Sequence, residues 1–306
     1  MTNFATSLSP LDITHAPEGG EVGPIQSGWR LALREFIQNK LAVIGIGILL
    51  FYVLFCFAGP IFYHGNTINS DLIHTNLPPV SGFPLGTSDQ GFDELGLLMK
   101  GGQAALEVGF AAAFIGIVIG MLWGAIAGLA GGIVDSAMMR VVDVFLSIPF
   151  LFIVLIVAVR YGASVLGLSL IIGAFTWLVP ARLVRGEVLT LRTRDFVAAA
   201  RTAGSGRWRL INRHLIPNAL GVIVVNVTFN VADAILAVAA LGYLGFGLHY
   251  PNQDWGDMLS SGIQYIGNGY WWQVYPVGAS IVLVVMACNL IGDALRDSLD
   301  VRLRRR

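Results

Sequence analysis

Long apolar runs separated by short polar segments dominate the pattern of this chain. A helix needs about 20 apolar residues to cross roughly 30 Å of hydrocarbon, and six runs approach that length. They lie at residues 41–63, 105–130, 141–159, 165–179, 220–245 and 274–291. The sequence therefore predicts an all-α integral membrane protein with six transmembrane helices.

The fourth run is short for a span, and Pro180 follows it directly. Proline removes a backbone donor, so it kinks a helix that continues through it. We expect this helix to continue past Pro180 to about Leu191 and to be tilted or kinked in the membrane.

Composition excludes a soluble globular protein. Of the 306 residues, 55% are hydrophobic and only 12% are charged, which is too few charges to cover a globule of this size. Cys56 and Cys288 both fall inside apolar runs, so no disulfide framework is expected. Residues 1–29 are polar and do not read as a cleaved signal peptide, and we interpret them as a mobile cytosolic tail.

Basic residues are distributed unevenly between the two sides of the predicted spans. If the amino terminus is cytosolic, Lys100 and Arg160 are the only Lys or Arg outside, and the other 17 of 19 lie inside. Cytoplasmic loops carry such an excess of basic residues. The sequence therefore predicts that both termini are cytoplasmic, with residues 64–103 and 246–273 outside.

This orientation gives a predicted organisation along the chain. The cytosolic tail at 1–29 is followed by an amphipathic entry and the first transmembrane helix at 30–63. An extracytoplasmic segment occupies 64–103. A five-helix core occupies 104–306 and contains a cytosolic loop at 192–218.

The cytosolic loop has a pattern of its own. Helix-forming residues 198–200 precede the sequence Gly204, Ser205, Gly206, and an amphipathic pattern resumes at 208–215. Glycines interrupt helices, so we expect two short helices set at an angle. Eight arginines from Arg182 to Arg213 make this region basic. Either a docking surface for a partner protein or the positive-inside bias alone explains these arginines.

Glycines recur every four residues along the second span. Gly116, Gly120, Gly124 and Gly128 fall on nearly one helical face, and such a ladder lets another helix approach closely. The ladder is either an interface that slides during transport or a static packing contact.

Polar residues share one face of the fifth span. Asn226, Asn230 and Asp233 stand at i, i+4 and i+7. A carboxylate at mid-membrane costs about 2.5–3.5 kcal/mol on insertion scales, so this face meets water or a partner group. It is either a wall of a translocation pathway or a hydrogen-bonded contact with another helix. At the third span, Arg140 and Asp143 are predicted to form a local ion pair.

Motifs for catalysis and cofactor binding are absent from the sequence. Neither Lys40 nor Lys100 stands in a phosphate-binding Gly-x-x-x-x-Gly-Lys-Ser/Thr frame. The five histidines have no spacing that would place two metal ligands on one helical face, and no nucleophile elbow occurs. We expect no metal, no cofactor and no enzymatic activity in this chain.

Six ordered motifs resemble those of a known family. The segment 196–218, FVAAARTAGSGRWRLINRHLIPN, resembles the cytoplasmic coupling loop of ABC importer permeases. The others are GTSDQGFDE from Gly86, GGIVDSAMMRVVDVFLSIP from Gly131, LGYLGFG from Leu241, DWGDML from Asp254 and NLIGDALRDSLDVRL from Asn289. Together they resemble the C-type permease subunit of dipeptide, oligopeptide and nickel importers, over about residues 30–306.

This resemblance implies a type I ABC importer permease in the bacterial inner membrane. The implied partners are a second homologous permease, two cytosolic ATPases that bind ATP and Mg, an extracytoplasmic binding protein and the lipid bilayer, with no nucleic acid. The implied coupling positions are Ala199, Ala200, Arg201, Gly204, Arg207, His214 and Pro217. Ala198 departs from the motif, which usually opens with an acidic residue.

The leading hypothesis is import of di- or oligopeptides driven by ATP that separate subunits hydrolyse. Nickel chelates, oligosaccharides and opines stay open as cargo. An ATP-independent carrier would need ion-binding residues in its spans, for which Asp143 and Asp233 are the candidates. A membrane scaffold without transport activity would leave the docking loop and the polar face without a role.

Overall fold

The computed structural model describes residues 28–161, 164–248 and 252–304, and the predicted tail at 1–29 lies almost wholly outside this part. Helices account for nearly all regular structure in these ranges, where only two isolated β-bridges occur. The helices are α1 (Gly28–Gln38), α2 (Lys40–Phe57), α3 (Gly59–Phe62), α4 (Glu94–Ala130), α5 (Gly132–Leu146), α6 (Phe150–Tyr161), α7 (Val165–Thr176), α8 (Leu178–Leu191), α9 (Asp195–Thr202), α10 (Arg207–Leu210), α11 (Ile216–Tyr243), α12 (Trp255–Ile263) and α13 (Tyr275–Arg304). The predicted all-α class is confirmed.

The number of membrane crossings depends on two bent helix pairs. Four segments of the described chain are long and apolar enough to span a membrane: Lys40–Phe62, Glu94–Ala130, Trp208–Tyr243 and Trp271–Leu299. The pairs α5–α6 and α7–α8 raise the number to six if each pair is one span. Four of the six predicted spans are thus single helices, and the other two predicted runs fold as these bent pairs.

The third predicted span is sharply bent. Helices α5 and α6 meet at 78°, around the segment from Ser147 to Pro149. Proline lacks an N–H and disfavours helical geometry in the residue before it. The Ser147 hydroxyl donates to the Val144 carbonyl at 2.7 Å and closes the end of α5. The interpretation of this run as an ordinary span missed the break.

The fourth span continues to Leu191, as its sequence predicted, and bends by 41° between α7 and α8. The bend falls at Trp177, three residues before Pro180. The missing N–H of Pro180 would have bonded the carbonyl of Thr176. The helix therefore breaks one turn before the proline.

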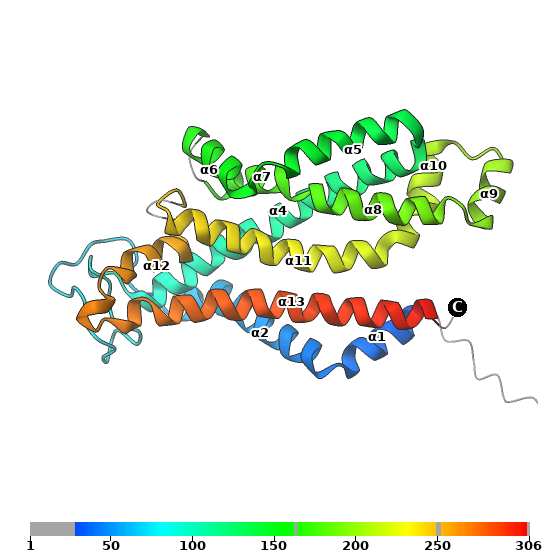
Figure 1. The fold of residues 1–306 in the computed structure, drawn as a ribbon. Helices are drawn as coiled ribbons and strands as arrows, with labels where there is room; N and C mark the ends of the chain where they lie inside the picture. The colour runs from blue at the N-terminus through cyan, green and yellow to red at the C-terminus, as the bar shows by residue number, and fades with distance from the viewer. Residues whose placement is uncertain (1–27, 162–163, 249–251, 305–306) are drawn as a thin grey trace, which may run out of the picture.

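Most long helices run side by side along the molecule (Figure 1). Helix α4 packs against α7, α8 and α11, while α13 packs against α11 and α2. Helices α9 and α10 lie at one end with α1 and the carboxyl end of α13, and α12 lies at the other end. The two ends of the described chain, at α1 and at the end of α13, therefore lie at the same end of the molecule as the loop. That this end is cytoplasmic stays a prediction.

The glycine ladder of α4 contacts α7 and α8 of the same chain. A Cβ atom added at Gly120 would lie 2.7 Å from the carbonyl oxygen of Trp177. One added at Gly128 would lie 2.9 Å from a Val188 methyl carbon. The ladder is thus an intrachain contact, in which the backbone of α4 approaches the α7–α8 pair too closely for a larger side chain.

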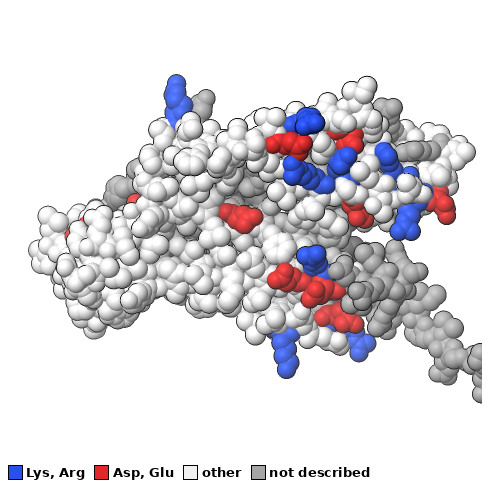
Figure 2. Space-filling model, viewed as in Figure 1, with Lys and Arg blue, Asp and Glu red and all other residues white. Residues whose placement is uncertain are grey.

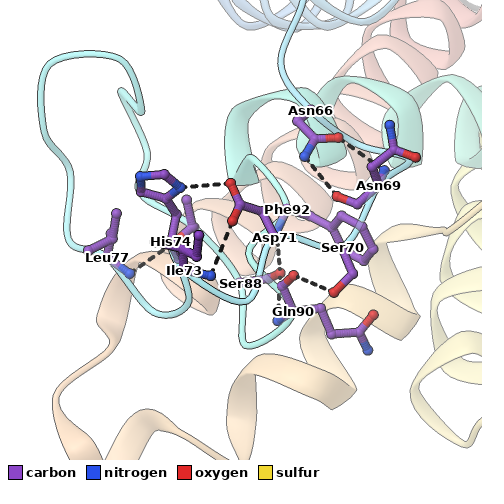
Figure 3. Close-up of polar contacts among 11 residues, drawn as sticks. Asn66, Asn69, Ser70, Asp71, Ile73, His74, Leu77, Ser88, Gln90 and Phe92 are labelled. Atoms are coloured by element: carbon purple, nitrogen blue, oxygen red, sulfur yellow. Dashed lines mark hydrogen bonds and ion pairs between the residues drawn. The ribbon is translucent and has the colours of Figure 1, made fainter.

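Residues 63–93 form an ordered cap rather than a loose connection. Figure 3 shows how hydrogen bonds link two segments of this loop. The Asp71 N–H and the Ser70 hydroxyl both donate to the Gln90 carbonyl, each at 3.0 Å. His74 Nδ1 lies 2.7 Å from Asp71 Oδ2, and this hydrogen bond lowers the pKa of the Asp71 carboxyl.

The cap is attached to the start of α13. Trp272 Nε1 and Gln273 Nε2 donate to the Thr87 carbonyl at 3.2 and 3.0 Å. These bonds join segments almost 190 residues apart, so the cap and the last span form one unit.

We expect Gly120→Leu to lower the thermal unfolding midpoint of the purified protein in mild detergent. The new side chain would meet the backbone of Trp177, and overpacking costs about 1–3 kcal/mol. Gly186→Leu in α8 is the matched control, because a Cβ there meets nothing within 4 Å. Equal midpoints for the two variants would contradict the close contact.

Candidate functional site

A cavity of about 860 Å³ lies where the two helix breaks face α11. The end of α5 and the start of α6 form one side, and the junction of α7 and α8 forms another. Its lining residues are mainly apolar: Phe145, Leu146, Ile148, Pro149, Phe150, Leu151, Ile153, Phe175, Thr176, Leu178, Val179, Asn226, Phe229, Asn230, Asp233, Leu236, Ala237 and Ala240. The two bends therefore shape this cavity.

The three polar residues singled out on the fifth span all line this cavity. Asn226 Nδ2 donates to the Val222 carbonyl of its own helix at 2.8 Å. Asn230 is only 6% exposed, and its Nδ2 has no hydrogen-bond partner in the described chain. Asp233 is exposed and lines the cavity. It forms none of the ion pairs found among the described residues.

These contacts bear on the two interpretations of the polar face. A hydrogen-bonded contact with another helix would satisfy Asn230 and Asp233, yet neither residue bonds to another helix in the described ranges. Unpaired polar atoms in a membrane are stabilised by water or by a partner molecule. The cavity can supply either one.

The predicted ion pair between Arg140 and Asp143 is wrong. Asp143 accepts a hydrogen bond from Arg182 of α8 instead. One turn further along α8, Arg185 Nη2 donates to Asp135 Oδ2 at 2.6 Å. These two ion pairs hold α5 against α8. Their partners are 39 and 50 residues apart, which a pattern of residues three apart could not indicate.

Glu107 is a carboxylate that the sequence reasoning passed over. It lies in α4 inside the predicted second span, and it is exposed. The signal was present, because any carboxylate inside an apolar run is costly in lipid. Glu107 does not line the cavity.

Charge is concentrated at one end of the molecule. Figure 2 shows Lys, Arg, Asp and Glu gathered over the end that carries α8, α9 and α1, whereas the middle of this face is nearly bare apart from one acidic patch. A bare middle suits a surface within hydrocarbon, and the charged end suits water.

The loop between α8 and α11 contains the glycine break that the sequence predicted. Helix α9 ends at Thr202, and Gly204 has a φ of +78°. The Ser205 N–H donates to the Ala200 carbonyl at 3.0 Å. A positive φ favours glycine over other residues, so Gly204 is needed for the angle of this turn.

The second part of the loop differs from the prediction of a separate short helix. Helix α10 passes into a π-helical turn, Ile211–Leu215, which continues directly into α11. The helical segment Trp208–Tyr243 is 36 residues long. The end of the loop is thus the first part of the span that carries Asp233.

The loop has a packed side and an open side. Val197, Leu210, Ile211 and Leu215 pack with residues of α4 and α8. The open side includes Ala199, Gly204, Pro217 and Trp208, the last of which is 59% exposed.

An open hollow of about 750 Å³ lies at the glycine turn, lined by Gly204, Gly206, Trp208, Arg209, Asn212 and Arg213. Of the other implied coupling positions, Ala200 packs against the buried side, and the ring of His214 lies 6.4 Å from that of Phe196. The side chains of Arg201 and Arg207 lie outside the described residues. An exposed, basic hollow above an apolar base is suited to docking.

Asp254 joins the far end of α11 to α12. Its carboxylate accepts hydrogen bonds from the N–H groups of Leu248, Gly256 and Asp257 at 2.8, 2.7 and 3.0 Å. A Cβ at Gly242 would collide with this carboxylate. Burial raises the pKa of Asp254 to about 6. The motifs LGYLGFG and DWGDML therefore form one junction.

No group of three or more His, Cys, Asp or Glu side chains that could hold a metal ion occurs in the described ranges.

Family models match the chain in two places. The model described as "Binding-protein-dependent transport system inner membrane component" matches residues 116–305. The model described as "N-terminal TM domain of oligopeptide transport permease C" matches residues 27–79.

Curated relatives are similar over most of their length. The chain is 38% identical to the dipeptide transport system permease protein DppC of Bacillus subtilis, over 90% of this chain and 86% of that protein. It is 36% identical to the oligopeptide transport system permease protein OppC of Haemophilus influenzae, over 91% and 90%.

A solved structure shares the fold. A chain of the MetNI methionine ABC transporter in an inward-facing conformation superposes with a TM-score of 0.52 at 24% identity. The match covers 66% of this chain and 96% of that chain. This chain therefore carries additional structure beyond the shared helical core.

We expect the protein to unfold at a lower temperature at pH 7.5 than at pH 5. The pKa of Asp254 rises from 3.8 to about 6 on folding, so its stabilising contribution is full below pH 4 and is lost as the pH passes 6. A difference of about 2 pKa units corresponds to about 3 kcal/mol in total, and roughly half of this is lost between pH 5 and pH 7.5.

Thermal unfolding of purified protein at the two pH values measures this change. Asp254→Asn should reduce the pH dependence. Asp71→Asn removes a half-buried carboxyl whose pKa is lowered, so that it is ionised at both pH values, and this variant should keep the pH dependence of the wild type. The same pH dependence in wild type and Asp254→Asn would contradict the assignment.

Proposed function

The chain belongs to the family of binding-protein-dependent transport system inner membrane components, and we propose that the cargo of this importer permease is di- and oligopeptides. It is a multi-pass protein of the bacterial inner membrane. The names of its relatives, which are dipeptide and oligopeptide permeases, support peptide cargo over nickel chelates, oligosaccharides or opines.

The proposed machine contains further subunits. A second, homologous permease completes the pathway, an extracytoplasmic binding protein delivers the cargo, and two cytosolic ATPases hydrolyse ATP. The absence of a phosphate-binding motif from this sequence supports placing ATP and Mg on the ATPases. This chain then performs no covalent chemistry.

The continuous helix from Trp208 to Tyr243 carries this proposal. One end belongs to the exposed basic loop, and its middle lines the cavity with Asn226, Asn230 and Asp233. We infer that the loop docks on the ATPases and that their closure moves this helix. Nucleotide would then bias the pathway between outward and inward access, as a two-state change.

The cavity is the proposed wall of the pathway. It opens on the surface of this single chain beside an exposed carboxylate, where lipid is an unfavourable neighbour. A second permease lying against this face would enclose it and leave water inside. The polar face of α11 would then contact cargo.

We expect Gly204→Leu to uncouple ATP hydrolysis from uptake in the reconstituted complex. A side chain at φ +78° strains the turn and changes the direction in which α9 meets α11. Loss of a coupling free energy of about 1–3 kcal/mol corresponds to roughly a 5–150-fold fall in uptake per ATP hydrolysed.

Gly206→Leu is the matched control for this experiment. It places the same side chain in the same hollow, at a position without a positive φ. Normal coupling in both variants would argue against a role for the turn. Equal uncoupling in both would indicate that filling the hollow, rather than straining the turn, blocks docking.

We expect single cysteines at positions 226, 230 and 233 to react with a water-soluble thiol reagent, in a background with Cys56 and Cys288 replaced. The rates should change when nucleotide traps the complex, because access to the cavity would alternate. A cysteine at Leu72, which is 77% exposed in the cap, serves as the reactive control. Inert cysteines at all three positions in every nucleotide state would rule out a water-filled pathway here.

A further inference from the structure

The cavity has a one-sided charge. Asp233 is its single ionisable lining residue, and no Lys, Arg or His of the described chain lines it. Arg182 and Arg185 follow the cavity-lining residues Leu178 and Val179 on α8. Both arginines are already ion-paired, with Asp143 and Asp135 respectively. The carboxylate therefore acts on the cavity without a compensating cation from the described residues.

The remaining lining also suits a cation. Phe145, Phe150, Phe175 and Phe229 lie around the cavity, and the rings of Phe145 and Phe175 are 6.0 Å apart. The faces of aromatic rings attract ammonium groups, and this attraction is stronger where water is excluded. An anion would meet the same rings and the Asp233 carboxylate unfavourably.

The two asparagines add groups that can pair with a peptide backbone. Asn226 uses its Nδ2 within its own helix, which leaves its Oδ1 to accept. Asn230 is only 6% exposed, and its Nδ2 is a hydrogen-bond donor without a partner in the described chain. From position 226 to position 233 a helix rises by about 10 Å, close to the length of three extended residues at about 3.3 Å each.

We propose that this cavity binds the primary ammonium group of the cargo at Asp233, with the adjoining peptide backbone along Asn230 and Asn226. The inference rests on the proposed function, in which the cavity lines the transport pathway. A carboxylate and an ammonium attract strongly where the surroundings are less polar than water. The exposure of Asp233 keeps this attraction moderate, so that cargo can leave.

The charge of the cavity can be measured with a cysteine one turn away. Leu236 lines the cavity, is 44% exposed and stands three residues from Asp233 on the same helix. In the full complex without Cys56 and Cys288, Leu236→Cys is treated with a cationic and with an anionic methanethiosulfonate reagent. Each rate is divided by that of the same reagent with 2-mercaptoethanol.

We expect the cationic reagent to be favoured by about tenfold, as a nearby unit charge in a partly screened site would produce. Asp233→Asn should remove this preference, and Asp233→Glu should keep it. Glu107→Gln is the matched control, because it removes an exposed carboxylate of a span outside the cavity. It should leave the preference unchanged.

The outcomes separate the two levels of the proposal. If neither reagent reacts in any nucleotide state, the pathway itself is wrong. If both reagents react and Asp233→Asn leaves their ratio unchanged, the pathway stands and the ammonium site is overturned.

Uptake then identifies the source of the ammonium group. Trialanine carries only the amino-terminal ammonium, and trilysine adds three on side chains. An equal severalfold loss of both in Asp233→Asn assigns the site to the amino terminus, and loss of trilysine alone assigns it to lysine side chains. Unchanged uptake of both peptides, with the Glu107→Gln variant as reference, overturns the site.

Discussion

Close backbone contact along the glycines of α4 is the constraint on which the positions of the other helices depend. Hydrocarbon is as apolar as the side chains, so helices in a membrane associate through packing and polar contacts. Gly116 to Gly128 receive α7 and α8, and Gly109 on the same helix lies against Ile235 of α11. Helix α4 thus fixes how far α8 stands from α11, and that separation is part of the width of the cavity.

Helix α11 combines a packed face with the polar face that we propose lines the pathway. Ala232, Ile235 and Val238 are buried among α4, α7 and α13 neighbours, whereas Asp233 and Leu236 line the cavity. Because the same helix begins in the basic loop, no flexible joint separates docking from the polar face. The only irregularity is the π-helical turn Ile211–Leu215, and such turns are frequent at functional sites.

Features set by neighbouring residues could be predicted from the sequence. The shared face of Asn226, Asn230 and Asp233 follows from helical periodicity, and the turn at Gly204 follows from glycine chemistry. The continuation of α8 to Leu191 also followed from a local pattern.

Features set by distant residues could not be predicted. The partner of Asp143 is Arg182 on another helix, and the glycine ladder could not name α8 as its neighbour. The bend before Pro149 depends on whether the freed backbone groups find other partners, which only the tertiary structure decides. Within the predicted span 105–130, Glu107 has no polar neighbour at helical spacing, so no pattern of residues singled it out.

The junction at Asp254 has a mechanical consequence. Since three backbone N–H groups bind this carboxylate beside Gly242, the far end of α11 is held in place. Under the proposed coupling, a push on the loop would tilt the helix about this end as a pivot. With a rise of about 1.5 Å per residue, Asp233 stands about 15 Å from the pivot and Trp208 about 53 Å. A displacement of about 3 Å at the loop then moves Asp233 by less than about 1 Å and Asn226 by almost twice as much. Such a lever would open the cavity as a wedge, widest toward the loop.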